Sequence, residues 1–415
     1  MLLLCKTIYL SLLQIIPVPN IYYILISICI LVVLSYIFNV VSEKLRVPSV
    51  IMLISAGVGI QFLGNEFDVN IPNTPFLLEL LGVVGLIFIV LEGALDLKLS
   101  RKKIPLIGKS FLSALFILIV TSAVIGAIFY YSLAMPLRTA IVYAVPLGII
   151  SSAIAIPSVS KLSPEKREFI IYETSFSDIL GIMLFNYVIG SEIGSFSSFL
   201  ELGVSFFLIV VVSLLSTFLL LLLLNYSRSH AKFYLIFASL ILVYSVSKIF
   251  HLPSLLLILV FGVMLNNANL FIKGKLADYL HPEKLKLVTR ELKIITAETA
   301  FIVRTFFFLI FGYTINLSLL KDKNVFVLGF VVMLTILVTR YVFLRFISRI
   351  NVFPELFIAP RGLITIVLFY SIPQQWKSDL FNEGILLFVI ILSTVTMMMA
   401  LLFTKTKLNY DTEIL

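Results

Sequence analysis

The stretch YETSFSDILGIMLF, residues 172–185, places two carboxylates in a segment that is apolar from Ile179 onward. If a membrane-spanning helix begins near Glu168, Asp178 lies about ten residues, or about 15 Å, from its start, which is half of a roughly 30 Å hydrocarbon layer. An ionisable group at that depth is costly and is a functional hypothesis by default. Asp178 is therefore a candidate for holding a proton or a small cation, one at a time. The alternative is a neutral, hydrogen-bonded Asp that joins helices.

The composition of the whole chain agrees with a membrane setting. Of its 415 residues, 60% are hydrophobic and 13% are charged, and the mean hydropathy is +1.13. A soluble domain carries about 25% charged residues, so water-soluble classes are excluded. Apolar runs of spanning length recur along almost the whole sequence, whereas barrel strands would be short and alternating. The chain is predicted to be an all-α polytopic membrane protein.

Thirteen transmembrane helices are predicted, each placed to within a few residues, at 21–41, 48–64, 76–95, 104–131, 138–159, 168–190, 199–224, 231–248, 253–268, 296–318, 324–345, 354–373 and 380–403. Lysine and arginine concentrate in alternate loops, which predicts a cytoplasmic C-terminus. The net charge of +9 is explained by this orientation rather than by nucleic-acid binding.

The predicted organisation has three parts. Residues 1–20 form a signal-like or interfacial segment, with a fourteenth span as the alternative. A transmembrane domain covers 21–403, and a short cytoplasmic tail covers 404–415. The charged connection over about 269–295 has helical spacing and is expected to lie on the cytoplasmic surface, where it links two halves.

Glu173 is expected to have a different role from Asp178. Glu173 stands five positions before Asp178, which turns a helix by about 140° net, so the two acids face different ways and are not expected to share one ion. A buried Glu needs a cation, and Arg340 in the eleventh span has a suitable depth. The alternative is an interfacial Glu173 near the cytoplasmic end of its helix.

Two spans carry residues that interrupt helices. PLGIISSAIAIP, residues 146–157, has a proline at each end and Ser151 and Ser152 between them. IAPRGLITI, residues 358–366, sets Arg361 between a proline and a glycine. Proline removes a backbone donor and glycine loosens a helix. Two interrupted helices in different halves indicate a binding site at the membrane midplane; the alternative for each is a kinked helix without a site.

At this point the chain resembles the monovalent cation:proton antiporters, the superfamily of sodium/proton exchangers, over nearly the whole membrane region. The family motif is a Glu followed by a polar residue and an Asp, here Glu173, Ser177 and Asp178. The resemblance implies that Glu173 pairs with an Arg of a later helix, and Arg340 stands at that place.

Further segments match the family or depart from it. The Arg-Gly of the second broken helix matches residues 361–362, and LEGALDL, residues 91–97, is similar to the family's Leu-Glu-Gly segment. Ser177 stands where the family has Asn or Asp. The first broken helix lacks the usual Thr-Asp-Pro, so the hydroxyls of Ser151 and Ser152 and nearby carbonyls are expected to substitute as ligands.

The resemblance implies inverted repeats with two crossing broken helices. It predicts a core of the fourth to sixth and eleventh to thirteenth spans, beside a dimerisation domain. The expected function is a homodimeric antiporter in a bacterial inner membrane that exchanges Na⁺ (or Li⁺ or K⁺) for H⁺ without net charge movement. Asp178 would carry the ions, and Arg361 would stabilise the crossing. No cofactor and no resident metal are expected.

Two other functions are alternatives. One is a sodium-coupled solute symporter or an ion channel of related fold. The other is a membrane-embedded enzyme, which is disfavoured because no histidine lies in mid-span and no nucleophile–base spacing is visible.

Overall fold

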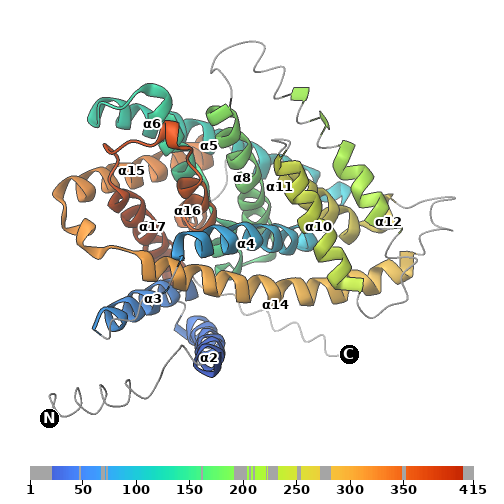
Figure 1. The fold of residues 1–415 in the computed structure, drawn as a ribbon. Helices are drawn as coiled ribbons and strands as arrows, with labels where there is room; N and C mark the ends of the chain where they lie inside the picture. The colour runs from blue at the N-terminus through green and yellow to red at the C-terminus, as the bar shows by residue number, and fades with distance from the viewer. Residues whose placement is uncertain are drawn as a thin grey trace.

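The computed structural model describes residues 21–45, 48–66, 71, 73–159, 162–190, parts of 203–222, 232–249, 254–271, 282–347 and 352–404. Every regular element in these ranges is helical (Figure 1). The predicted N-terminal segment 1–20, much of the seventh span and all but the first residue of the tail 404–415 lie outside the described residues.

The helices follow the predicted apolar runs. The α-helices are α2 (Ile21–Leu45), α3 (Ser49–Glu66), α4 (Thr74–Asp96), α5 (Ile104–Ser132), α6 (Leu137–Gly148), α7 (Ser152–Ser158), α8 (Pro164–Gly190), α10 (Lys232–Ile249), α11 (Ser254–Asn266), α12 (Ala268–Phe271), α14 (Pro282–Thr314), α15 (Lys323–Val342), α16 (Leu363–Tyr370) and α17 (Glu383–Phe403). Short turns of other helix types are η1 (Arg101–Lys103), η2 (Leu317–Lys321), η3 (Phe343–Ile347), η4 (Glu355–Phe357) and η5 (Gln374–Trp376).

Within the described residues, six helical stretches have the length and apolar character needed to cross a membrane. They are Thr74–Asp96, Ile104–Ser132, Leu137–Ser158, Lys286–Thr314, Lys323–Ile347 and Glu383–Phe403. Shorter apolar helices, such as Ser49–Gly64 and Phe233–Ile249, accompany them. The all-helical membrane class is confirmed, and the number of thirteen spans stays a prediction.

α14 begins earlier than the sequence predicts. The tenth span was expected from residue 296, but α14 already starts at Pro282, so part of the connection expected over 269–295 belongs to this helix. Val288 and Leu292, which lie one turn apart, are buried because this first part of α14 packs on α11 and α12. Figure 1 shows α14 running below α4 across most of the molecule.

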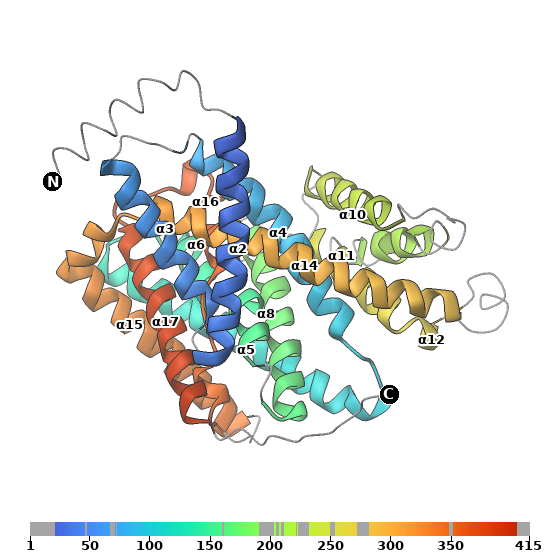
Figure 2. The same ribbon diagram turned by 90° about the horizontal axis from the view of Figure 1, so that it is seen from below.

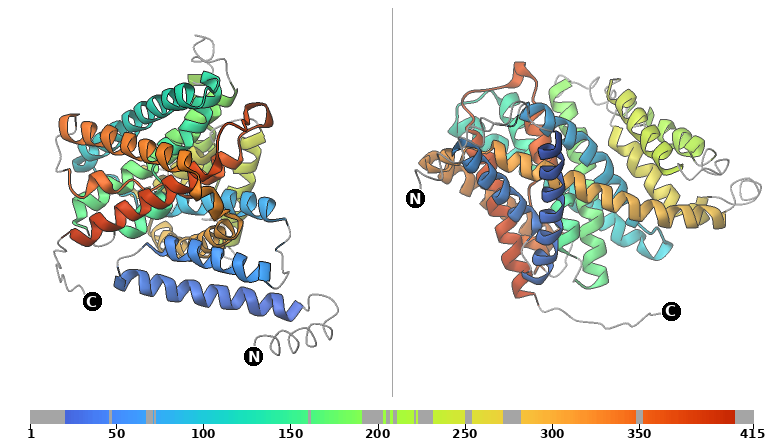
Figure 3. Two further views of the ribbon diagram at one scale, coloured as in Figure 1. Left: turned by 90° about the vertical axis from the view of Figure 1, so that its left-hand side faces the viewer. Right: turned by 60° about the horizontal axis from the view of Figure 1, so that its bottom comes forward.

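Two groups of helices pack together. In what we call the flanking group, α14 lies along α3 and α4, α2 packs on α3, and α11 packs on α4 (Figures 2 and 3). In what we call the core group, α5 packs on α6 and α8, and α15 packs on α17 and α5. The core group repeats one order of elements, which is a helix, an interrupted span and a second helix. The first copy is α5, α6–α7 and α8, and the second copy is α15, η4–α16 and α17. The predicted repeat with two broken helices is therefore present.

The α3–α14 crossing depends on two glycines. A Cβ atom on Gly57 would lie 2.1 Å from the backbone oxygen of Leu309, and one on Gly312 would lie 2.3 Å from that of Ile54. Small residues allow such close approach of helices in membranes.

Gly57→Ala is expected to lower the free energy of unfolding by about 1–3 kcal/mol, as overpacking does. Thermal unfolding in detergent measures this. Gly59→Ala is the matched control, because a Cβ atom there meets nothing within 4 Å; equal losses in both variants would contradict the prediction.

Candidate functional site

The two interrupted helices meet at their non-helical segments. The first break covers residues 149–151, between α6 and α7, and the second covers residues 358–362, between η4 and α16. The backbone N–H of Ser151 donates to the carbonyl of Pro360 at 2.9 Å. Backbone groups that leave a helix inside a membrane need partners within the protein. Each break thus provides a partner for the other, and the predicted crossing is observed.

Arg361 binds the end of the opposite broken helix. Its Nε donates to the carbonyl of Leu147 at 2.8 Å and its Nη2 to that of Gly148 at 3.3 Å. Its Nη1 donates to Ala359 at 2.6 Å, and its own N–H donates to the hydroxyl of Ser393 at 3.0 Å. The last carbonyls of a helix have no donor within that helix, and a cation is favourable at its C-terminus. The fully buried Arg361 therefore stabilises the end of α6.

Asp178 lies on α8 beside the first break, with no exposed surface. Among the described residues, neither carboxylate oxygen has a hydrogen-bond partner. The backbone N–H and the hydroxyl of Ser152 lie close enough to act on this carboxylate. The neighbouring Ser177 hydroxyl oxygen accepts the N–H of Ile150 at 2.9 Å, which holds the break against α8. The Ser151 hydroxyl is also buried and without a partner in the described part of the chain.

These oxygens form an unusual combination. Buried polar atoms in proteins are nearly always hydrogen-bonded, and each exception calls for an explanation such as a water molecule or an ion. A carboxylate with nearby hydroxyls offers oxygen ligands to a cation and a binding site to a proton. The arrangement can therefore hold either species at one place inside the membrane.

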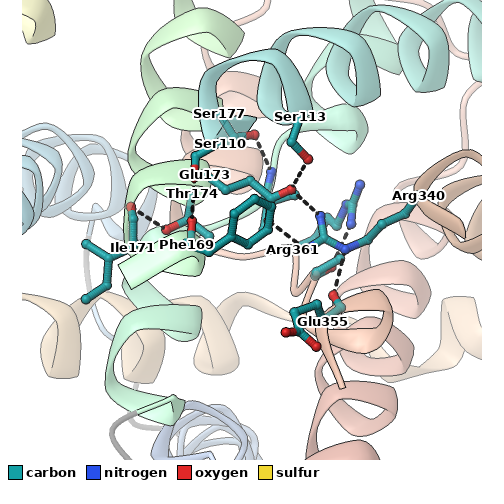
Figure 4. A network of polar contacts seen from close by, with 12 residues as sticks. Ser110, Ser113, Phe169, Ile171, Glu173, Thr174, Ser177, Arg340, Glu355 and Arg361 are labelled. Atoms are coloured by element: carbon teal, nitrogen blue, oxygen red, sulfur yellow. Dashed lines mark hydrogen bonds and ion pairs between the residues drawn. The ribbon is translucent and has the colours of Figure 1, made fainter. Parts of the chain in front are cut away.

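Glu173 lies in a separate network (Figure 4). Its carboxylate accepts two parallel hydrogen bonds from Arg340, at 3.0 Å from Nη1 and 2.6 Å from Nη2, and both side chains are fully buried. The Ser113 hydroxyl on α5 also donates to this carboxylate. The remaining guanidinium donor, Nε of Arg340, binds the carbonyl of Glu355 at 2.8 Å. The ion pair thus joins α5, α8, α15 and η4, and Asp178 takes no part in it.

Several members of this network were missed by the sequence reading. Lys166, at the start of α8, forms an ion pair with the buried Glu355 carboxylate at 2.8 Å. Ser113 lies one turn after Ser110, whose hydroxyl donates to the carbonyl of Phe169 at 3.3 Å. Two serines at helical spacing in a mostly apolar span were a signal that this side of α5 faces a polar group on a neighbouring helix.

Comparison with known proteins gives the family. A family model described as the sodium/hydrogen exchanger, transmembrane, matches residues 29–405. The chain belongs to the sodium/hydrogen exchanger family. No curated protein sequence matches the chain.

Solved structures agree on the fold of this exchanger. The sodium proton antiporter MjNhaP1 from Methanocaldococcus jannaschii, in its structure at pH 8, superposes with a TM-score of 0.66 over 92% of this chain and 99% of its own, at 22% identity. A second structure of that antiporter, from an electron-microscopy map, also gives 0.66, at 21% identity over 92% and 95%. Family and fold together support cation:proton exchange, and the predicted family and fold class are confirmed. The family is one of transporters and not an enzyme class.

Proposed function

We propose that this exchanger carries Na⁺ (or Li⁺ or K⁺) in one direction and H⁺ in the other, one for one, and that Asp178 binds both in turn. The observation that supports this proposal is the fully buried carboxylate of Asp178, whose two oxygens have no hydrogen-bond partner among the described residues. An ionisable residue in such a place marks an ion or proton pathway more often than a structural feature.

Because the cation and the proton compete for one carboxylate, the gradient of one ion can drive the exchange without another energy source. When Asp178 releases a proton it can bind a cation, and when it releases the cation it can bind a proton. In both loaded states the site is neutral, so movement of the loaded core group transfers no net charge. Movement of the empty, negatively charged carboxylate through the membrane is costly, and this cost couples the two ions.

The other residues have supporting roles in this proposal. The hydroxyls of Ser177, Ser151 and Ser152 supply oxygen ligands beside Asp178. The Glu173–Arg340 pair keeps α8 and α15 together while the core group moves, and Arg361 holds the two breaks in contact. In either loaded form the site is exposed first to one face of the membrane and then to the other as the core group shifts against the flanking group.

The surroundings of the exchanger follow from the same proposal. The transport domain is assigned to residues 21–403, with residues 1–20 and 404–415 as flanking segments. The exchanger works as a homodimer in the lipid of a bacterial inner membrane, with the flanking group at the dimer contact. The C-terminus faces the cytoplasm, as the distribution of lysine and arginine predicts.

The proposal is tested in vesicles that hold the purified protein and a pH-sensitive dye. Addition of Na⁺ is expected to release protons from the acidic side, and a series with Li⁺ and K⁺ ranks the cations. The initial rate is expected to be the same with and without an imposed membrane potential, because the exchange moves no net charge. A rate that follows the potential would contradict one-for-one exchange. Na⁺ uptake that needs another solute and moves no protons would replace the proposal with a symporter.

A further inference from the structure

One polar contact joins the flanking group to the broken helix beside Asp178. Nη1 of Arg304, on α14, donates to the carbonyl of Ala153 at 3.3 Å. Ala153 is the second residue of α7 and directly follows Ser152. The contact therefore ends one residue from a group that acts on the Asp178 carboxylate.

The carbonyl of Ala153 is available because of a proline. In an α-helix this carbonyl would accept the N–H of the residue four positions later, which is Pro157 and has no N–H. Ala153 is buried, and an unpaired carbonyl inside a membrane protein costs free energy. Arg304 supplies the donor that the proline removes. The next carbonyl of α7, that of Ile154, accepts the Ser158 hydroxyl at 2.7 Å.

The acidic side chain that acts on Arg304 belongs to the flanking group itself. Glu92, on α4, is the carboxylate that acts on the Arg304 guanidinium, and the two form no direct ion pair among the described residues. The adjacent Gly93 lies against α7 and α8, since a Cβ atom there would be 3.4 Å from Oγ of Ser175 and 3.6 Å from Ile156. Glu92 and Arg304 are thus placed where the flanking group meets α7.

We propose that Arg304 is a positioning residue for the exchange: it holds the first turn of α7, and with it Ser152, in the place that the cation site requires. The contact joins the two groups that move against each other in the proposed exchange, on which this inference rests. The contact between Arg304 and Ala153 therefore breaks when the core group has shifted and the site faces the other side of the membrane. In that state Glu92 still acts on the released guanidinium.

The experiment restores the missing donor by a second route. Pro157→Ala gives residue 157 an N–H that can reach the Ala153 carbonyl, so Arg304 is no longer needed there. Exchange is measured against Na⁺ concentration for wild type, Arg304→Ala, Pro157→Ala and the double variant. Arg304→Ala is expected to raise the apparent KM for Na⁺ about tenfold in the wild-type background, as the loss of a charged hydrogen bond does. In the Pro157→Ala background it is expected to raise KM by less than about twofold. Arg304→Lys, which keeps a charged donor, is expected to stay near wild type.

An unchanged KM in Arg304→Ala would overturn the inference, and so would an equal fold-change in both backgrounds. If Arg304→Ala does not fold, the double variant is expected to regain folding, and its failure to do so would also overturn the inference. Thermal unfolding of the same four proteins is measured in parallel. If wild type moves no protons in response to any cation, the proposed function fails. The coupling between Arg304 and Pro157 is then tested by the unfolding temperatures of the four proteins, which support it if Arg304→Ala destabilises the wild-type background more than the Pro157→Ala background and overturn it otherwise.

Discussion

Asp178→Asn is expected to reduce cation-driven proton movement to that of vesicles without protein. The amide is nearly the same size as the carboxyl group, so the packing around α8 is kept. It carries no negative charge to hold a cation, and it does not take up and release a proton in the accessible pH range. Both half-reactions of the proposed exchange are therefore lost together, for Na⁺, Li⁺ and K⁺ alike. The dye assay with the three cations measures the loss.

The variant also separates loss of function from loss of fold. Because no hydrogen bond to the Asp178 carboxylate is present among the described residues, Asp178→Asn is expected to unfold at a temperature no lower than wild type. Asp322→Asn is the matched control. It makes the same chemical change at the exposed N-cap of α15, where Asp322 accepts the N–H of Asn324 at 2.9 Å and Asn is an equally good cap. Exchange by Asp178→Asn at the wild-type rate would remove Asp178 from the mechanism.

The interrupted helices could be predicted because their cause is local. Proline lacks an N–H wherever it stands, so the prolines at residues 146, 157 and 360 each remove a backbone hydrogen bond and mark spans whose helices are weakened there. The first break lies between its two prolines, which stand inside α6 and α7. The position of a residue along its span follows in the same way from the residue count. These two facts were enough to single out Asp178, Glu173 and Arg361.

The partners of the buried charges depend on tertiary packing and could not be derived in full. A buried arginine must find acceptors, but nothing local indicates that those of Arg361 are the carbonyls of Leu147 and Gly148 in the other repeat. Arg304 is a charge within an apolar span, and its neighbours in the sequence indicate no partner. Its acceptor follows from Pro157 only once α7 and α14 are seen together. The early start of α14 was missed because its charged first part was interpreted as a surface connection.

Arg340→Ala is expected to lower the free energy of unfolding by about 3–5 kcal/mol, because it leaves a buried carboxylate without its cation. Both side chains of the Glu173–Arg340 pair are fully buried, and Arg340 also donates to the carbonyl of Glu355. Thermal and chemical unfolding in detergent measure the loss. Lys103→Ala is the control: it removes an ion pair with Glu168 whose side chains are 30% and 35% exposed. Such pairs contribute about 0–1 kcal/mol.

The double variant Glu173→Leu/Arg340→Leu shows which part of this loss comes from the unpaired charge. Replacing both partners of a buried ion pair by apolar residues is often neutral. Here the Ser113 hydroxyl also loses its acceptor and the Glu355 carbonyl loses one of its two donors, so the double variant is expected to be less stable than wild type but more stable than Arg340→Ala. If the pair only holds helices together, a folded double variant should still exchange cations for protons through Asp178. An Arg340→Ala protein as stable as wild type would remove the structural role. A stable double variant that no longer exchanges would instead give the pair a part in transport itself.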